Sequence, residues 1–419
     1  MRRSAAGLLL ALALLLAIVH AYYPLLPRWL AGAAGWGAGL LLLPDLASRV
    51  RWQAGILLVL GLLGLLAGWR GGVAVPWQQA LAGNSLLIAM LTAVSFLRLI
   101  SEPAADAAER PPRGRRALGS TLLGLHLFGA VINLPAVFIM ADRMRNGGRL
   151  SSHQVVVLTR AFGACAFWSP FFAAMAAALT YAPEARLSAV MLAGLPLAAL
   201  ALLGTYWQLR RHAESIQGFP MHYGSLWLPG LLALAVLVLH GLWPTFSVLA
   251  LVSTLAPVLA ALVLALRGQA TALGRHVRTG VPRMVNELGL FLAAGVLAAG
   301  LGALVPLWFD ELPVGAFGPP MAAASLLLMW LVALVGVHPV VSIAALGALV
   351  APLEPDPNLL ALTFVASWAL GVTCGPLSGL NLALHSAYRI PALDLLRGNL
   401  AYGLLMMPAV WVVQFTFFG

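Results

Sequence analysis

The sequence predicts an all-α integral membrane protein with roughly eleven transmembrane helices, two re-entrant hairpins and two inverted structural repeats. Of its 419 residues, 62% are hydrophobic and 9% are charged, whereas about 25% of a soluble globular protein is charged. Apolar runs near the spanning length of about 20 residues recur along the whole chain. Finally, a pattern of one polar tip and two proline-broken apolar segments occurs twice.

The expected spans are apolar runs that begin at about positions 5, 29, 52, 117, 153, 187, 224, 245, 320, 358 and 394. Two further runs, 78–100 and 284–305, carry polar groups near their starts, so we predict the hairpins there. The first run follows Met1-Arg2-Arg3 and ends near a motif that resembles a signal-peptidase site. We favour an uncleaved span, because the next apolar run follows almost at once, and a cleaved signal peptide is the alternative.

The repeated pattern has nearly the same spacing in both copies. The interval from tip to first proline is 51 residues from Asn84 to Pro135 and 53 from Asn286 to Pro339. The second prolines, Pro170 and Pro376, follow after 35 and 37 residues. Repeated pairs of Gly/Pro-interrupted apolar segments indicate a binding site between two repeats at the bilayer midplane.

The pattern divides the chain into scaffold helices at 1–73, a first repeat at 74–209, connecting scaffold helices at 210–277 and a second repeat at 278–419. If both hairpins return to the side they enter, most loop Arg residues gather on one side, which is then cytoplasmic. The opposite side collects Arg110, Arg113, Arg115, Arg116 and Arg186. If 78–100 crosses the membrane completely, the cluster 110–116 moves to the cytoplasmic side.

The net charge of +11 does not indicate a nucleic-acid partner. All 24 basic residues are Arg, and we expect them in short loops, as in the positive-inside pattern of membrane proteins. Cys165 and Cys374 lie within apolar runs and provide neither a disulfide framework nor metal-ligand spacing. The chain lacks a nucleotide P-loop and a zinc-binding His-Glu-x-x-His motif. We therefore expect no cofactor, no metal and no enzymatic activity.

Three segments of the second repeat occur in an order known from one group of transporters. Residues 286–295 form a glycine-rich stretch, 331–339 end in Gly-Val-His-Pro, and 370–376 carry Thr-Cys-Gly-Pro before a closing span at 394–418. This order resembles the ion transporter superfamily, in particular its divalent anion/sodium symporter family. The resemblance covers the two repeats, roughly two-thirds of the chain, and implies a secondary transporter fold.

The chain departs from that family at the residues that carry chemistry. The family's Ser-Asn-Thr signature holds sodium and the substrate carboxylate. Here the corresponding breaks read Ile-Asn-Leu-Pro at 132–135 and Gly-Val-His-Pro at 336–339. The resemblance therefore implies neither the coupling ion nor a dicarboxylate or citrate substrate.

Helix breaks are candidate binding sites, because unpaired backbone groups persist in a membrane only where protein or water satisfies them. The N-terminus of a half-helix presents free N–H groups, which suit an anion. Prolines that merely kink packed helices are the alternative, and four breaks at matched spacing favour a site. The predicted substrate-binding residues are Asn84, Ser85, Asn133, Ser169, Asn286, Thr373, Gly375, Ser378 and Asn381.

Glu287 and His338 are the candidates for coupling-ion exchange, since ionisable groups inside a membrane are costly unless they face protein or water. For His338, a neutral imidazole bonded to a carbonyl freed by Pro339 is an equal alternative. For Glu287, the alternative is an interfacial pair with Arg283 one turn earlier.

We predict a multi-pass secondary transporter of the bacterial inner membrane that moves a small, preferably anionic solute by a rocking or elevator-like exchange. Symport with protons is preferred to symport with sodium. The partners are the solute, the coupling ion and membrane lipid, but no nucleic acid, and a homodimer stays open. The alternatives are an exporter of a metabolite, oxyanion or amphiphile, a non-transporting scaffold or assembly protein, and a lipid-processing enzyme, which the shortage of intramembrane acids disfavours.

Overall fold

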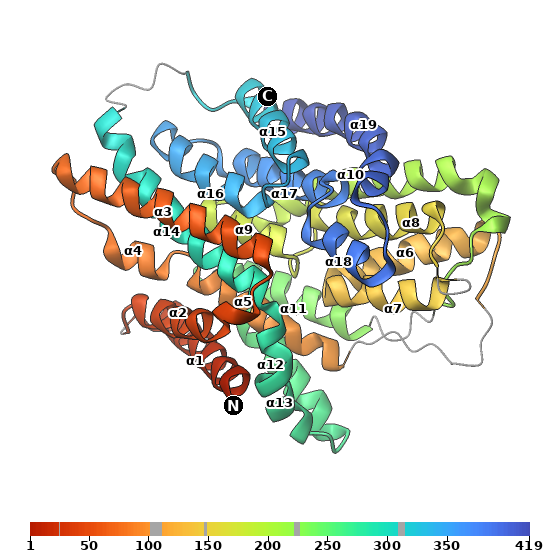
Figure 1. Ribbon diagram of the computed structural model, residues 1–419, viewed down its shortest axis with the longest axis horizontal. Helices are drawn as coiled ribbons and strands as arrows, with labels where there is room; N and C mark the ends of the chain where they lie inside the picture. Colours follow the sequence, from red (N-terminus) through yellow and green to blue (C-terminus); the bar gives the residue numbers. More distant parts are fainter. Residues whose placement is uncertain (25, 101–110, 146–148, 222–226, 309–314) are drawn as a thin grey trace.

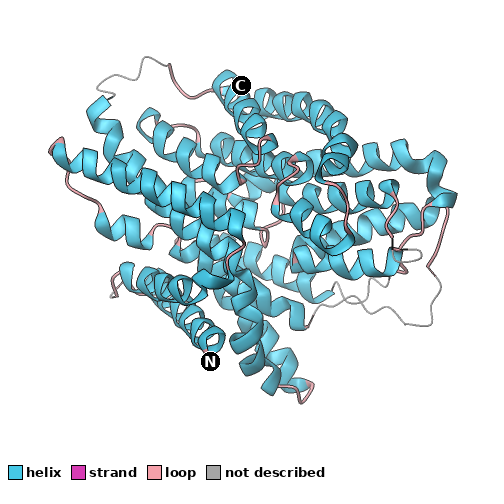
Figure 2. Ribbon diagram, in the orientation of Figure 1, coloured by secondary structure: helices cyan, strands magenta, loops and turns pink. Residues whose placement is uncertain are grey.

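The computed structural model describes residues 1–419 except 25, 101–110, 146–148, 222–226 and 309–314. Within these described ranges every regular element is a helix (Figure 2), and eight candidate spans are long and apolar enough to cross a membrane. In lipid, backbone polar groups must be satisfied within the chain, and a helix does this within one segment. The expected all-α integral membrane class is confirmed.

The helices keep one numbering throughout (Figure 1): α1 Arg2–Tyr22, α2 Trp29–Leu42, α3 Ser48–Arg70, α4 Trp77–Ala82, α5 Ser85–Val94, α6 Arg115–Ile132, α7 Leu134–Met144, α8 Ser152–Gly163, α9 Ala173–Tyr181, α10 Leu187–Leu209, α11 Trp227–Leu242, α12 Val248–Leu266, α13 Thr271–Arg275, α14 Val285–Trp308, α15 Pro319–Leu334, α16 Pro339–Val350, α17 Pro357–Cys374, α18 Gly379–Tyr388 and α19 Ala392–Phe418.

Helices α3 and α14 form the backbone of the scaffold and lie along each other. Gly61, Gly64 and Gly68 of α3 face the middle of α14, and a Cβ atom built on Gly64 would lie only 2.7 Å from the carbonyl oxygen of Gly300. Small residues let two backbones approach this closely in a membrane. The pair is therefore tightly packed and leaves little room for sliding.

Neither segment expected to form a re-entrant hairpin does so. Segment 78–100 is a broken span in which α4 packs on α2 and α14, while α5 packs on α1 and α12, so the two pieces lie end to end (Figure 1). Segment 284–305 lies within one continuous helix, α14, with Asn286 and Glu287 in its first turn. The prediction of hairpins at these positions is wrong, because the polar residues begin helices, where an acid suits the helix dipole.

The first hairpin is instead α6 and α7, which reverse at Asn133. At the start of α8, Gln154 donates to the carbonyl oxygen of Met144, at the end of α7, and to that of Gln217. The next residue, Gly218, donates its N–H to the carbonyl of Pro112, just before α6. The end of α7 and the start of α6 therefore lie together, and Figure 1 shows α6, α7 and α8 side by side.

The second hairpin is α15 and α16. Trp411 of α19 donates to the carbonyl of Ala323 in the first half of α15, and Gln414 donates to Thr363 in the first half of α17. The first halves of α15 and α17 thus contact neighbouring residues of α19 and lie at the same height along it. Because only a short turn separates α16 from α17, α16 must return toward that level. The first broken helix expected in each repeat is therefore a hairpin tip.

The two groups of four helices, α6–α9 and α15–α18, lie against each other in opposite directions. The end of α8 meets the end of α17, where a Cβ on Gly163 would collide with the hydroxyl of Thr373. The backbone N–H of Arg186, after α9, donates to Asn358 at the start of α17 at 2.8 Å. Helix α9 therefore runs back along α17, which is buried at every residue from Leu359 to Cys374.

A tyrosine ends the second half of each broken helix and contacts the hairpin of the other group. Tyr181 of α9 packs on α16, where a Cβ on Gly347 would lie 3.0 Å from it. Tyr388 of α18 lies near the ring of Phe138 and donates to Asp142 of α7 at 3.0 Å. Each group is thus fastened to the other at equivalent positions.

The basic loops at the first hairpin gather at one end of the molecule. The N–H of Gly114, beside Arg113, Arg115 and Arg116, donates to the carbonyl of Ala213 after α10. The same end holds residues 143–145 at the end of α7. The prediction that Arg113, Arg115 and Arg116 face the opposite side is therefore wrong, since 78–100 crosses completely; Arg110 lies outside the described residues.

Candidate functional site

The broken helix of the first group unwinds at residues 168–172, after a 3-10 segment at Ala164–Phe167. The buried Ser169 hydroxyl donates to the carbonyl of Ala130 in α6 and accepts the N–H of Phe171 at 3.2 Å. At the hairpin tip, the Asn133 amide donates to the Phe171 carbonyl at 3.2 Å. Two predicted site residues, Asn133 and Ser169, thus satisfy backbone groups at this break.

The broken helix of the second group unwinds just after α17. The Ser378 hydroxyl donates to the carbonyl of Val372 at 2.8 Å and accepts the N–H of Asn381 at 3.2 Å. The Asn381 amide donates to the carbonyls of Thr373 and Gly375 at 3.2 and 2.9 Å. The structure therefore brings together all four site residues predicted here. Asn381 is fully buried, and its Oδ1 has no hydrogen-bond partner among the described residues.

The four prolines fall into two structural kinds. Pro135 and Pro339 lie in the first turns of α7 and α16, where a helix needs no N–H donor. Pro170 and Pro376 lie in the unwound segments. Each tip approaches its own break, since Asn133 donates to Phe171 in the first break and a Cβ on Gly336 would lie 2.7 Å from Leu377 in the second.

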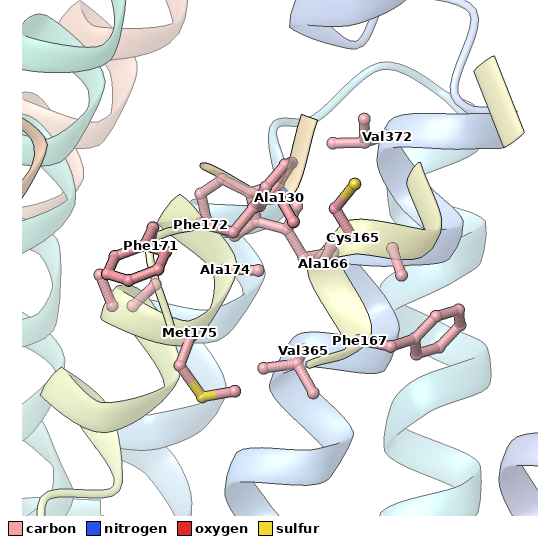
Figure 3. Packing of buried hydrophobic residues seen from close by; sticks show 14 of the residues in the cluster. Ala130, Cys165, Ala166, Phe167, Phe171, Phe172, Ala174, Met175, Val365 and Val372 are labelled. Atoms are coloured by element: carbon pink, nitrogen blue, oxygen red, sulfur yellow. The ribbon is translucent and has the colours of Figure 1, made fainter. Parts of the chain in front are cut away.

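The two breaks are packed around α17. Figure 3 shows Val365 and Val372 of α17 close to Cys165, Ala166 and Phe167, just before the first break. Beside this break, a cavity of about 150 Å³ is lined by Trp168, Ser169, Pro170, Phe171, the end of α6 and small residues of α11. The unwound segment of the first group therefore adjoins a small cavity.

His338 caps the start of α16 with its Nδ1, which accepts the N–H of Val340 at 3.2 Å. Its ring stands edge-on to Trp368, with centroids 5.2 Å apart. The imidazole is held as an acceptor and is not bonded to a freed carbonyl. Glu287 is half-buried and pairs with no basic side chain among the described residues, so the expected pair with Arg283 is not formed.

The residues predicted at hairpin tips lie away from the two breaks. Asn84 is buried at the start of α5, next to Ser85, and donates to the Phe291 carbonyl at 2.7 Å and the Tyr181 hydroxyl at 3.1 Å. Asn286 accepts the N–H of Ala47 at 3.1 Å and so caps the start of α3. Both residues fasten α14 to its neighbours instead of closing a cavity from opposite faces.

A larger cavity of about 480 Å³ lies between the scaffold and the second hairpin. Its walls are α4 and α14 on one side and the end of α9 and α16 on the other. Gly83, Gly295, Tyr181, Ala74 and Ala351 are among the residues that line it. The cavity thus lies beside the end of α16, while α16 itself also packs directly on α14.

Arg160 is the functional candidate that sequence reasoning missed. It is only 3% exposed in α8, and its guanidinium donates to Asn399, Gln208 and the Gly398 carbonyl at 3.0, 2.7 and 2.8 Å. The Tyr402 ring lies 4.8 Å away. No carboxylate in the described part of the chain pairs with it. An Arg after an apolar Val-Val-Val-Leu-Thr run was the signal that could have identified it.

His126 holds the aromatic wall of the small cavity. Its Nε2 accepts the indole N–H of Trp168 at 2.9 Å, and its Nδ1 donates to the carbonyl of Ala161 at 3.1 Å. The imidazole therefore carries its proton on Nδ1 and fixes Trp168 at the first break. Within the described ranges, no three His, Cys, Asp or Glu side chains gather as a metal site requires.

No protein-family model and no curated protein sequence matches this chain. Among solved structures, the YdaH transporter of Alcanivorax borkumensis is similar in fold, with a TM-score of 0.53 over 87% of this chain and 96% of that one. The sequence identity is 14%, so the similarity concerns the fold alone. The chain is a multi-pass membrane protein with a membrane-transporter fold.

Proposed function

We propose that the protein is a secondary transporter whose solute binds at the two unwound segments, 168–172 and 375–378. The observation that carries this proposal is their placement on antiparallel broken helices, each covered by the tip of its own hairpin. Such paired discontinuous helices hold solutes and coupling ions in transporters with inverted repeats. The repeats then span 74–209 and 278–419, each with a long or broken helix, a hairpin, a broken helix and a closing span.

An anionic solute is favoured by charge. Arg160 is a buried cation without a carboxylate partner in the described ranges, and no described acid lies at either break. An uncompensated cation in a membrane attracts negative charge.

Proton coupling is our preferred mode, with Glu287 as the candidate carboxylate, since His338 is engaged in capping α16. In proteoliposomes, a pH gradient without sodium should drive uptake, and Glu287→Gln should abolish that response while leaving solute binding intact. Strict dependence on sodium, with the variant like the parent protein, would contradict proton coupling but not transport.

The test of transport uses purified protein in proteoliposomes and a panel of radiolabelled small carboxylates and oxyanions. Ser169→Leu and Ser378→Leu fill the two breaks and should reduce flux at least tenfold, as expected for a lost binding site. Thr416→Leu, on an exposed face of α19, is the matched control and should behave like the parent. If flux survives both Leu substitutions, the solute does not bind at the breaks. If the parent protein itself transports no member of the panel, a non-transporting scaffold becomes the better account.

A further inference from the structure

The tip of the second hairpin turns through a glycine whose carbonyl faces the scaffold. Gly336 has φ +99°, a conformation that glycine adopts without strain. Its N–H bonds to the Ala333 carbonyl and that of Val337 to Val332, which closes α15 in the glycine-ended turn common at helix C-termini. These bonds leave the Gly336 carbonyl free to point away from both arms.

Two side chains of α3 bind this carbonyl. The Gln53 amide donates to it at 2.7 Å, and the Arg49 guanidinium lies at 3.5 Å, at the outer limit of a hydrogen bond. Gln53 and Arg49 are one turn apart and so lie on the same face of the helix. Helix α3 is itself fixed, because its glycines pack on α14 and Asn286 caps its first turn.

The same tip covers the second break. A Cβ on Gly336 would lie 2.7 Å from Leu377 in the unwound segment, and Pro339 lies against Gly371. At its far end, at Gly347 and Ala348, α16 borders the cavity of about 480 Å³. The hairpin therefore has space beside the far end of its second arm and a polar attachment at its tip.

We propose that Gln53 and Arg49 form a latch that holds the second hairpin against α3 and thereby keeps the break at 375–378 covered. Release of the Gly336 carbonyl lets the tip leave α3 and exposes the break. This inference rests on the proposed function for its purpose, but the latch itself is a property of the resting protein and needs no solute. A neutral hydrogen bond contributes about 1 kcal/mol net, so loss of the Gln53 bond should shift the ratio of docked to undocked tips about five-fold.

The experiment measures the distance between spin labels on the tip and on the far end of α3. Val335→Cys and Trp69→Cys place the labels at side chains that are 74% and 62% exposed, while the native Cys165 and Cys374 are fully buried. Pulsed electron resonance on the full chain in lipid nanodiscs should give one dominant docked distance. Gln53→Leu should lower the docked fraction about five-fold relative to the undocked one, and the double variant Arg49→Met/Gln53→Leu should lower it further.

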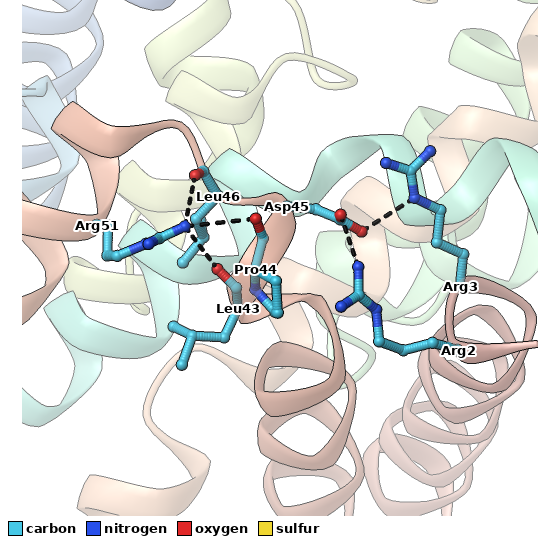
Figure 4. A network of polar contacts seen from close by, with 7 residues as sticks. All are labelled: Arg2, Arg3, Leu43, Pro44, Asp45, Leu46 and Arg51. Carbon is cyan, nitrogen blue, oxygen red and sulfur yellow. Dashed lines mark hydrogen bonds and ion pairs between the residues drawn. The ribbon is translucent and has the colours of Figure 1, made fainter.

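Arg51→Gln is the matched control. Its guanidinium binds the carbonyls of Leu43, Pro44 and Leu46 in the turn before α3, not the hairpin (Figure 4), so its distance distribution should equal that of the parent. The latch is refuted if the Gln53 and double variants keep the parent distribution, or if Arg51→Gln changes it equally. If the latch variants shift the tip but no solute is transported, the latch stands and the proposed function fails.

Discussion

At the scale of single residues, Asn381 is the side chain on which the second break depends most. Asn381→Leu removes the donors to the Thr373 and Gly375 carbonyls and leaves both buried. Each unsatisfied group costs about 1–3 kcal/mol, so for the two carbonyls we expect a loss of roughly 2–6 kcal/mol in stability. The unfolding midpoint in detergent measures it. Thr416→Val on the exposed face should change the midpoint little, and equal effects of the two substitutions would contradict this role.

Asp45 gives a prediction for the effect of pH. The hydrogen bond from Arg3, with help from the charge of Arg2, holds the pKa of the Asp45 carboxyl below its usual value, and Figure 4 shows both contacts. Because the folded pKa is the lower one, the contribution of the pair is complete above the ordinary value of about 3.9 and is lost as the pH falls through the folded pKa. A spin label at Ser4→Cys should therefore be immobile at pH 7 and become mobile only below about pH 3.9.

The control for this pair is Asp45→Asn, in which the label should be mobile at every pH. High salt should also loosen the parent, since the pair is exposed to solvent. A label whose mobility is the same in the variant and the parent would show that α1 is held by packing alone.

The sequence locates polar residues at the breaks more accurately when their hydrogen-bond partners are close in sequence than when the partners lie on distant helices. The sequence predicts Ser378 and Asn381 as residues that line a binding cavity at the second break, and the structure places both at that break, bonded to its freed backbone groups. Asn84 and Asn286 were placed at tips, but they cap or join helices, which the same residue type does equally well. The apolar run before Arg160 marks it as a candidate, but its burial and its partners depend on α10 and α19, which are distant in sequence.

At the scale of elements, Arg160 joins α8 to α10 and α19. Arg160→Met leaves three acceptors, on Asn399, Gln208 and Gly398, without this donor, so we expect a loss of roughly 3 kcal/mol or more at about 1–3 kcal/mol per unsatisfied group. Thermal unfolding in detergent measures the change. Arg186→Met, at an exposed side chain, is the control.

Arg160→Lys separates charge from geometry. It keeps the positive charge but cannot reach three acceptors with a planar fork, so stability should fall between that of the parent and that of the Met variant. If the Met variant is as stable as the parent, the guanidinium does not hold these helices together.

The repeated elements were predictable, but their shapes were not. The matched spacing of the prolines marks four points where the helices are interrupted, and the structure shows two of them as breaks and two as hairpin tips. A proline marks a helix start equally well in a kink and in a reversal, and so two hairpin tips were read as broken helices. Asn133 and Gly336 have positive φ where the chain reverses, and an Asn or Gly two or three residues before the proline is the available signal.

At the scale of the whole molecule, the basic ends of the first hairpin determine the expected orientation. Tyr388 contacts Asp142 at that end, and α19 begins four residues later and is long enough to cross the membrane. If the basic end is cytoplasmic, the C-terminus faces the opposite side. A C-terminal alkaline phosphatase fusion expressed in a bacterium should therefore be active, and a green fluorescent protein fusion should be dark. The reverse pattern would invert the orientation.

The tyrosines that fasten each group to the hairpin of the other group have a consequence for synthesis. Tyr181 is synthesised long before its partner helix α16, and Asp142 is synthesised long before its partner Tyr388. During translation the first half must therefore persist in the bilayer with its contact surfaces open to lipid, and tertiary folding is completed only when the C-terminal third has been inserted. A chain truncated before α16 should accordingly be degraded by membrane quality-control proteases, because incompletely assembled segments expose the surfaces that such systems recognise.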